Sequence, residues 1–232
     1  MLKIENFEVL GWEHAIRGMR NPMNSWEKSD SNFFDDSEGH VCNICQGRGS
    51  MSLIEMGPND HDLMMRLRNA GTDHRKFMRM ITVYVDITAP LYWWKEFDTY
   101  RVGVEKNSCS TMHKIHAKEF DVNDFSHEHV EELTGDDYNM SYDFLLRTVD
   151  ILNYYRRKFL ETKDKKYWWQ MIQLLPTSYN QKRTVMLNYE VLANIYKSRR
   201  NHKLDEWHTF CDWVSELPYS ELITGEEYEV EE

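Results

Sequence analysis

The sequence has no long apolar run. None of its stretches reaches the roughly eighteen consecutive apolar residues that a membrane-spanning helix needs. The chain begins Met1-Leu2-Lys3-Ile4-Glu5, without the apolar core of a secretory signal. We therefore expect a cytoplasmic protein that has no membrane partner.

Cysteine is also scarce. Four cysteines in 232 residues are too few for a disulfide framework, which fits a reducing compartment. Cys42 and Cys45 form a CxxC pair flanked by His40 and His61, but the sequence contains no second CxxC. A lone CxxC is weak evidence for zinc. We predict an ordinary reduced pair and no metal site.

Positive charge is in deficit. Lysine and arginine number 28 against 39 aspartates and glutamates, so the net charge is −11. Binding to duplex nucleic acid through a broad basic face is driven by counterion release from phosphates, which an acidic chain does not favour. We expect no nucleic-acid partner. Local basic clusters such as Lys182-Arg183 and Lys197-Ser198-Arg199-Arg200 can still hold one phosphate each.

The chain nevertheless contains enough apolar material for a core. Its residues are 41% hydrophobic and 13% aromatic, and its length suits one medium domain. We predict a single domain over residues 1–225 and an acidic tail over residues 226–232. Residues 21–58 are rich in Asn, Ser, Asp, Gly and Met and have little periodicity, so we expect a long functional loop there.

Hydrophobic periodicity predicts the regular elements. Helices are expected over residues 60–70, 92–100, 142–163, 166–174, 189–199 and 204–217, and strands within 7–18, over 78–87 and over 184–187. Residues 116–137 are acidic and are expected to be exposed.

The most distinctive stretch follows the Ala89-Pro90 corner. Three large aromatics at 92–94 are followed by Lys95, Glu96, Arg101 and Lys106. Aromatic faces with fixed cations suit a planar heterocycle that carries phosphates. The same pattern is also typical of an amphipathic helix with a solvated charged face.

The order of this stretch resembles the signature of the flavin-dependent thymidylate synthases. Counted from Ala89-Pro90, the family's Arg-Gln pair falls on Lys95-Glu96 and its Arg-His-Arg triplet on Thr99-Tyr100-Arg101. The Asn-Glu step falls on Lys106-Asn107, and the final Ser-x-Arg-Tyr on Cys109-Ser110-Thr111-Met112.

Three further blocks occur in the family's order. They are Ala15-Ile16-Arg17, residues 67–77, and a C-terminal block of Leu175-Pro176, Asn188, Asn194, Arg199 and Glu206-Trp207. Together the blocks span nearly the whole chain.

The resemblance implies an α/β (α+β) fold with a central, mostly antiparallel sheet flanked by helices. It also implies a homotetramer with flavin sites at subunit contacts. The implied activity is FAD-dependent methylation of dUMP to dTMP, with methylenetetrahydrofolate and NADPH as co-substrates. In such enzymes the flavin carries the chemistry, while the protein orients rings and neutralises phosphates.

The resemblance also implies residue roles. Arg199 is the arginine that polarises the uracil ring and Arg101 the signature arginine near flavin and nucleotide. The cofactor-binding residues are Arg101, Tyr100, His74, Asn188 and Asn194, and the substrate-binding residues are Lys95, Glu96, Lys106, Asn107, Ser108, Ser110 and Arg199.

Cys109 falls where the family has a serine close to the pyrimidine. A thiolate beside Lys106 could add to C6 of a pyrimidine, which makes Cys109 a second candidate catalytic residue. The other interpretation is a small buried thiol that replaces the serine.

Several signature residues differ from the family's. Lys95 stands where the family has an arginine and lacks the bidentate fork of a guanidinium. Glu96 replaces a glutamine and introduces a negative charge. Thr99 and Thr111 each replace an arginine, so two cations are missing. Each lost phosphate contact costs about 1.5–3 kcal/mol, so other cations such as Lys106, Arg183 or Arg200 must compensate, or the ligand differs. Two alternatives follow: a related deoxyuridylate C5 transferase with altered donor or product, and a non-catalytic nucleotide- or flavin-binding homologue.

Overall fold

The computed structural model describes residues 2–34, 53–131 and 140–225. Within it the chain divides into two compact units. The α6–α7 unit contains residues 88–99 and 107–183 with the N-terminal residues up to Lys3, and the α8 unit contains residues 4–87, 100–106 and 184 onwards. The single domain over residues 1–225 stays a prediction.

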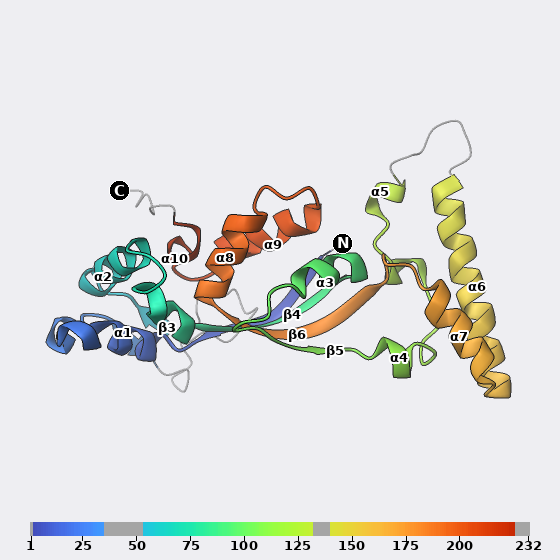
Figure 1. Ribbon diagram of the computed structural model, residues 1–232, viewed down its shortest axis with the longest axis horizontal. Coiled ribbons are helices and arrows are strands. Elements are labelled where there is room, and N and C mark those ends of the chain that lie inside the picture. Colours follow the sequence, from blue (N-terminus) through green and yellow to red (C-terminus); the bar gives the residue numbers. More distant parts are fainter. Residues whose placement is uncertain (1, 35–52, 132–139, 226–232) are drawn as a thin grey trace. The chain divides into compact units, whose positions relative to one another are not determined.

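The main sheet has four strands in the order β1-β4-β6-β5 (Figure 1). They are β1 (Lys3–Leu10), β4 (Thr82–Pro90), β6 (Asn180–Asn188) and β5 (Glu105–Ser108). Val83, Val85, Ile87 and Ala89 of β4 are buried in alternation, as the period of a strand requires. The mixed α/β fold with its antiparallel sheet and helices confirms the predicted fold class.

The α8 unit contains most of the short elements. They are α1 (Trp12–Arg20), η1 (Asn21–Met23), η2 (Trp26–Lys28), β2 (Asn32–Phe34), β3 (Leu53–Glu55), α2 (Pro58–Asn69), η4 (Arg75–Met80), α8 (Tyr189–Arg199), α9 (Asp205–Ser215) and α10 (Glu221–Thr224). Aromatic rings form part of its core: the Trp12 ring lies 5.3 Å from that of Tyr189 and 5.3 Å from that of Tyr219, edge to face.

The turn between β1 and α1 requires a glycine. Gly11 has a φ of +93°, and a Cβ at this position would overlap the backbone carbonyl oxygen of Met80. A side chain is therefore excluded both by the left-handed backbone and by the close approach of η4.

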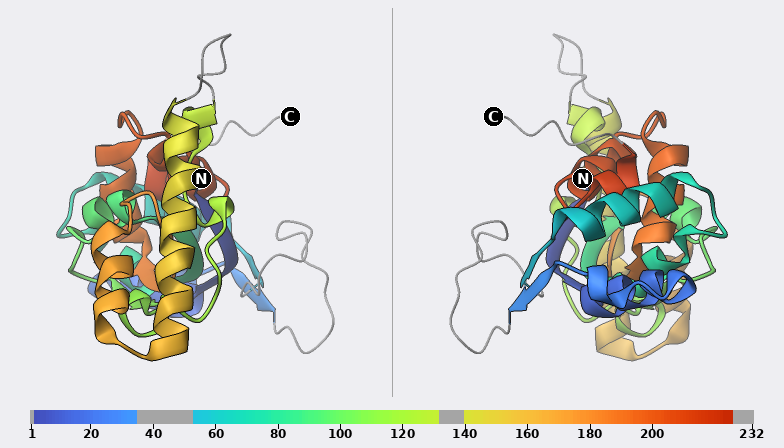
Figure 2. Two further views of the ribbon diagram at one scale, coloured as in Figure 1. Left: turned by 90° about the vertical axis from the view of Figure 1, so that its right-hand side faces the viewer. Right: turned by 90° about the vertical axis from the view of Figure 1, so that its left-hand side faces the viewer.

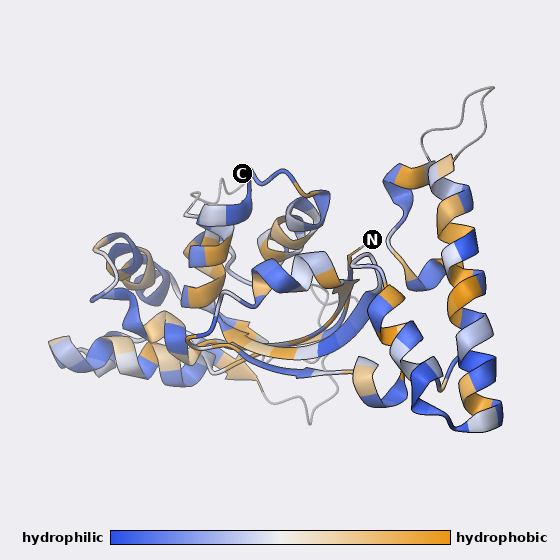
Figure 3. Ribbon diagram, turned by 45° about the vertical axis from the view of Figure 1, so that its right-hand side comes forward, coloured by the Kyte–Doolittle hydropathy of each residue, from blue (hydrophilic) through white to orange (hydrophobic). Residues whose placement is uncertain are grey.

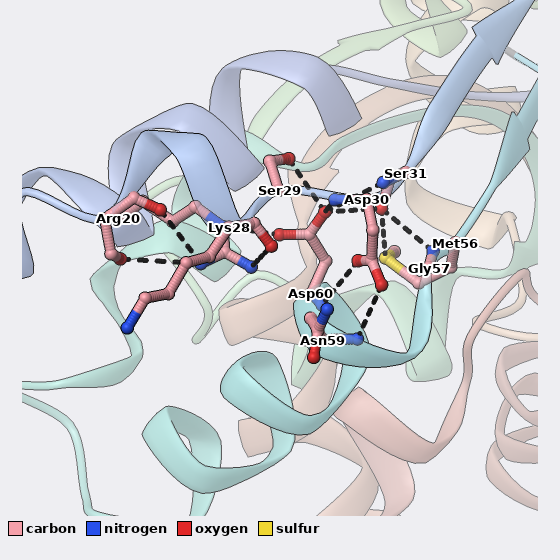
Figure 4. Close-up of polar contacts among 10 residues, drawn as sticks. Arg20, Lys28, Ser29, Asp30, Ser31, Met56, Gly57, Asn59 and Asp60 are labelled. Carbon is pink, nitrogen blue, oxygen red and sulfur yellow. Dashed lines mark hydrogen bonds and ion pairs between the residues drawn. The ribbon is translucent and has the colours of Figure 1, made fainter.

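A buried ion pair joins α1 to α2 (Figure 4). Arg20 Nε lies 2.6 Å from Asp60 Oδ1, and both side chains are almost fully buried. The second Asp60 oxygen accepts hydrogen bonds from the Ser29 and Ser31 hydroxyls, and Arg20 donates to the backbone carbonyls of Ser25 and Lys28. The pair thus fixes the backbone of residues 25–31, within the segment predicted as a loop.

The α6–α7 unit is built around a helical hairpin. Its elements are α3 (Leu91–Phe97), α4 (Thr111–Lys114), η5 (Val122–Asp124), α5 (Glu128–Glu131), α6 (Met140–Thr162) and α7 (Lys165–Leu174). Helices α6 and α7 lie side by side (Figure 2), and polar and apolar residues alternate along α6 (Figure 3). The hairpin buries Leu145, Leu152 and Met171 against Phe120 and Phe125.

The structure corrects several expectations. Helix α1 lies where no helix was expected, and the helix expected over 92–100 ends at Phe97. Asn32–Phe34 and Leu53–Glu55 are not loop but pair as antiparallel strands, Phe33 opposite Ile54. The strand expected from residue 78 begins at Thr82, because Arg75–Met80 forms a 3₁₀ helix. No strand was expected over Glu105–Ser108, which forms β5. Residues 116–131 are not uniformly exposed, since their two phenylalanines enter the core.

The helices were predicted more closely. The expected bounds of α8 agree with the structure, and those of α2, α6, α7 and α9 differ by one or two residues at one end or both. Within the described residues, no helix is long and apolar enough to cross a bilayer. The CxxC pair and the acidic tail lie outside the described residues.

Candidate functional site

Arg199, at the C-terminal end of α8, lies against two aromatic rings of the α8 unit. Its Nε donates to the Tyr100 hydroxyl at 2.9 Å. Its Cζ is 4.7 Å from the centroid of the Trp207 ring and 5.7 Å from that of Tyr100. Trp207 is fully buried. The two rings and the hydrogen bond therefore hold the guanidinium in place.

Lys106 contacts the backbone of Tyr100. Its Nζ is 3.4 Å from the backbone carbonyl oxygen of Tyr100, to which it donates. The structure thus brings together three of the predicted residues, Tyr100, Lys106 and Arg199, in one cationic and aromatic cluster. We call these three residues with Trp207 the Arg199 cluster.

Asn188 caps α8. Its side-chain oxygen accepts a hydrogen bond from the backbone N–H of Val191 at 3.1 Å. A Cβ on Gly103, whose φ is +72°, would lie 3.0 Å from Asn188 Nδ2. The capping bond leaves the amide nitrogen of Asn188 beside a glycine turn, where the backbone approaches closely.

Asn194 lies two turns further along α8. Its side-chain oxygen accepts from Arg75 Nη2 at 3.0 Å, which orients the amide. His74 precedes η4 and is exposed, and Arg101 is exposed as well. The predicted cofactor-binding residues of the α8 unit therefore come from α8, from the turn after Tyr100 and from the start of η4.

Arg75 and Arg79 both pair with one carboxylate of α8, that of Glu190. Glu190 is buried, its Oε1 accepts from Arg75 Nε at 3.3 Å, and its Oε2 accepts from Arg79 Nε. Burial raises the pKa of the Glu190 carboxyl, but the hydrogen bonds and charges of Arg79 and Arg75 outweigh burial, and the pKa is lowered. Glu190 is therefore ionised at neutral pH.

A second cluster surrounds Cys109 in the α6–α7 unit. Cys109 follows β5 and is exposed. Its backbone N–H donates to the carbonyl of Lys182 at 2.9 Å, and its carbonyl accepts from Gln181 Nε2 at 2.8 Å. The backbone on both sides of the thiol is thus held by β6. Because the Cys109 side chain is exposed, the interpretation of Cys109 as a buried thiol is wrong.

Arg183 lies in the same cluster. Its Cζ is 4.2 Å from the centroid of the Trp94 ring, its Nη1 is 2.8 Å from Asp98 Oδ1, and its Nε donates to Gln181 Oε1 at 3.0 Å. Gln181 therefore connects Arg183 to the Cys109 backbone. We call Cys109, Gln181 and Arg183 with Trp94 and Asp98 the Cys109 cluster.

The other predicted substrate-binding residues lie on the neighbouring elements. Lys95 and Glu96 belong to α3, and Lys95 is exposed. Asn107 and Ser108 are exposed on β5. The Ser110 hydroxyl caps α4 by accepting from the backbone N–H of His113 at 3.1 Å, which gives this residue a structural role.

Sequence reasoning missed Arg75, Arg79, Asp98 and Gln181. Arg75 directly follows His74 in a block that departs from the family's pattern, and this departure was the available signal. Asp98 had no signal, since it is 85 residues from the Arg183 that it binds. Gln181 is two residues before Arg183 on β6, and this spacing, which places two side chains on one face of a strand, was the available signal.

A polar pocket of about 600 Å³ opens between the ends of α8 and α9. Residues lining it include Tyr196, Arg200, His202, His208 and Cys211. Burial raises the pKa of the Cys211 thiol to about 11, so this cysteine stays protonated at neutral pH. Among the described residues, no group of three or more His, Cys, Asp or Glu side chains is arranged to hold a metal ion.

No family model and no curated protein matches the sequence. Solved structures match in fold. Thymidylate synthase X (ThyX) from Helicobacter pylori, solved with FAD and dUMP, matches over 97% of this chain and 98% of its own, with a TM-score of 0.64 and 16% identity. A second structure of the Helicobacter pylori flavin dependent thymidylate synthase ThyX, complexed with FAD and dUMP, matches over 96% and 98% with a TM-score of 0.63 and 16% identity.

A different enzyme also matches. The UMP/dUMP methylase PolB from Streptomyces cacaoi, bound with 5-Br dUMP, matches over 97% of this chain and 95% of its own, with a TM-score of 0.55 and 11% identity. At such low identity the likeness shows the fold alone. The chain has a ThyX-like fold, as the resemblance predicted.

Proposed function

We propose that the protein methylates dUMP to dTMP with FAD as cofactor, methylenetetrahydrofolate as carbon donor and NADPH as reductant. The observation that carries the proposal is the Arg199 cluster, in which the arginine that the resemblance assigns to the uracil ring lies against two aromatic rings. The fold likeness over nearly the whole chain supports it. The reaction balances as dUMP, methylenetetrahydrofolate, NADPH and a proton giving dTMP, tetrahydrofolate and NADP⁺.

The residues fit such ligands by their chemistry. A guanidinium held on aromatic rings can polarise a pyrimidine carbonyl, and the outward amides of Asn188 and Asn194 can donate to the edge of a flavin. Tyr100, Arg101 and His74 would complete the cofactor site. When bound, the flavin would supply the redox chemistry.

The substrate side of the proposal uses the remaining cations and polar groups. Lys95 and Lys106 would neutralise the phosphate of dUMP, while Asn107, Ser108 and Ser110 would donate to it or to the sugar. Glu96 would accept from a substrate N–H or O–H group. The proposed assembly is a homotetramer.

The first test is the visible spectrum of the protein after incubation with FAD and removal of the excess. A flavin band that shifts on addition of dUMP supports one pocket for both ligands. Assays of dUMP-dependent NADPH oxidation and of dTMP formation then test turnover. Oxidation that stays at background with dUMP present would contradict the proposal.

Arg199→Lys tests the cluster directly. Lysine keeps the charge but loses the planar fork that lies against Trp207, so we expect kcat to fall at least about a hundredfold while flavin is retained. Lys203→Gln, an exposed change shortly after the same helix, is the matched control and should leave kcat within about twofold. Equal activity of both variants would remove Arg199 from the mechanism.

A related C5 transferase with altered donor or product is the second candidate. It is favoured by the exposed Cys109, whose backbone is held on both sides, and whose thiolate could add to C6 of the pyrimidine. Cys109→Ser should abolish turnover in this case and leave it intact in the flavin mechanism. Saturable dUMP binding without any turnover would instead indicate a non-catalytic binding protein.

A further inference from the structure

Two arginines of the α8 unit share a single buried carboxylate. Glu190 pairs with both Arg75 and Arg79, and its side chain is 8% exposed. Arg75 is 17% and Arg79 is 55% exposed. One negative charge therefore fixes two guanidiniums side by side at the surface.

A third arginine, Arg68, adds a positive charge near Arg75. It donates from Nε to the backbone carbonyl of Leu222 at 3.2 Å and from Nη2 to that of Ile223 at 3.3 Å. Burial lowers the pKa of Arg68, and the charge of Arg75 lowers it further. The Arg68 side chain thus bonds to neutral groups and lies within the electrostatic reach of Arg75.

The charges in this region do not cancel. The exposed Asp73 also acts electrostatically on Arg79. Asp73 and Glu190 together carry two negative charges, and the three arginines carry three positive charges. The five residues therefore have a net positive charge in a chain whose net charge is −11. A local positive site in an acidic protein attracts an anion.

The donor geometry favours an anion with two charged groups. Each guanidinium has five N–H donors. Arg75 uses Nε and Nη2 for protein bonds and Arg79 uses Nε. The remaining donors of two neighbouring forks can bind oxygens on two adjacent phosphates, as in a diphosphate, while a single phosphate needs one fork.

Arg75 also connects this group to the proposed cofactor site. Its Nη2 holds the side-chain oxygen of Asn194, and the resemblance assigns Asn194 to the flavin edge. Thr99 and Thr111 stand where the family's signature has arginines, so a phosphate-bearing cofactor lacks these two cationic partners here. A second cationic group beside Asn194 can replace them.

We propose that Arg75 and Arg79, fixed on Glu190 and supported by Arg68, bind the diphosphate of a dinucleotide cofactor. The diphosphate site follows from the contacts of the arginines. The dinucleotide, either FAD or NADPH, rests on the proposed function.

Calorimetric titration of the 232-residue protein with inorganic pyrophosphate tests the site without any flavin. Arg79→Gln is the variant, because Glu190 keeps Arg75 as its partner and the fold is preserved. We expect its Kd for pyrophosphate to rise about tenfold or more, and the wild-type affinity to fall as salt is raised. Arg66→Gln removes an exposed charge that pairs within α2 with Asp62, and it should change Kd less than twofold.

Two results would overturn the site. One is a wild-type protein that does not bind pyrophosphate at millimolar concentration, and the other is an Arg79→Gln variant that binds it as tightly as wild type does. Arg79→Lys is the second variant, which keeps the charge and loses the fork, and we expect an intermediate Kd. Thermal unfolding of each variant checks that the fold is retained.

The identity of the dinucleotide is tested by comparing FAD with FMN, which lacks the diphosphate. If the site holds FAD, Arg79→Gln weakens FAD binding about tenfold and leaves FMN binding unchanged. If it holds NADPH, the same variant weakens NADPH alone. Pyrophosphate binding that is lost with both dinucleotides unaffected would overturn the dinucleotide assignment. Failure of dUMP to shift a bound flavin would contradict the proposed function and leave the pyrophosphate result standing.

Discussion

Asp60 is the buried charge on which the N-terminal segment most depends. One of its oxygens binds Arg20, and the other accepts from Ser29, Ser31 and the backbone N–H of Asp30. These bonds compensate the cost of removing both charges from water. The stabilisation is therefore lost when one partner is removed.

Asp60→Asn should lower the free energy of unfolding by about 3–5 kcal/mol, because Arg20 would remain buried without a counter-charge. Urea unfolding followed by tryptophan fluorescence measures the difference. The control Asp62→Asn removes an exposed carboxylate on the same helix and should cost less than about 1 kcal/mol. A loss as small as the control's would mean that Arg20 finds another partner.

The same residue predicts a pH dependence. Burial raises the pKa of Asp60, but the hydrogen bonds of Ser31, Ser29 and Arg20 outweigh burial and lower it. A lowered folded-state pKa contributes stability that is present above the unfolded-state value and is lost as pH falls through the folded-state value. The stability gap between wild type and Asp60→Asn should therefore be constant near neutral pH and narrow in acid. A gap that stays constant down to pH 3 would contradict this assignment.

At the scale of elements, α8 connects the proposed site to the core. Its apolar residues are buried, its N-terminus is capped by Asn188 and its C-terminus carries Arg199. The cap gives Asn188 a structural role in addition to the flavin contact that the resemblance implies. The two roles can be separated by substitution.

Asn188→Ser retains an N-cap oxygen and removes the amide nitrogen. We expect its stability to stay within about 0.5 kcal/mol of wild type, while Asn188→Ala should lose about 1 kcal/mol. If the amide donates to the flavin, both variants should bind FAD several-fold more weakly. FAD titration and urea unfolding of both variants measure the two effects. Unchanged FAD affinity in the serine variant would mean that Asn188 caps α8 and does not bind the flavin.

Helix α6 exposes an apolar face, which bears on the assembly of the protein. Met140 and Phe144 are each 72% exposed, and Ile151 and Tyr154 are also exposed. Apolar residues gathered on one helix are typical of an association surface. The predicted homotetramer would cover them.

We expect sedimentation to give the mass of four 28.0 kDa chains. Phe144→Glu should weaken the assembly more than tenfold, because it places a charge in an apolar contact. Glu161→Gln, an exposed change on the same helix, should leave the mass unchanged. A wild-type monomer at micromolar concentration would contradict the tetramer.

Periodicity along the chain predicted helices α2, α3, α6, α7, α8 and α9 and parts of strands β4 and β6, but it did not predict α1. Apolar residues at three- and four-residue steps defined α6 and α7, and a strong local pattern of this kind is sufficient for a helix. The spacing of short blocks from Ala89-Pro90 to Trp207 was sufficient to predict the ThyX-like fold, which the structural comparison confirms. Strand β5 was missed because Glu-Lys-Asn-Ser is polar and has no alternation.

Which charges meet depends on the packing of elements that are distant in the sequence. Arg75 and Glu190 are 115 residues apart, Arg183 and Asp98 are 85 apart, and Arg20 and Asp60 are 40 apart. No local pattern predicts such pairs, because each depends on how separate elements pack. Local sequence thus predicted most of the longer helices and the order of the signature blocks, whereas packing decided that Arg199 lies against Trp207 and that two arginines share Glu190.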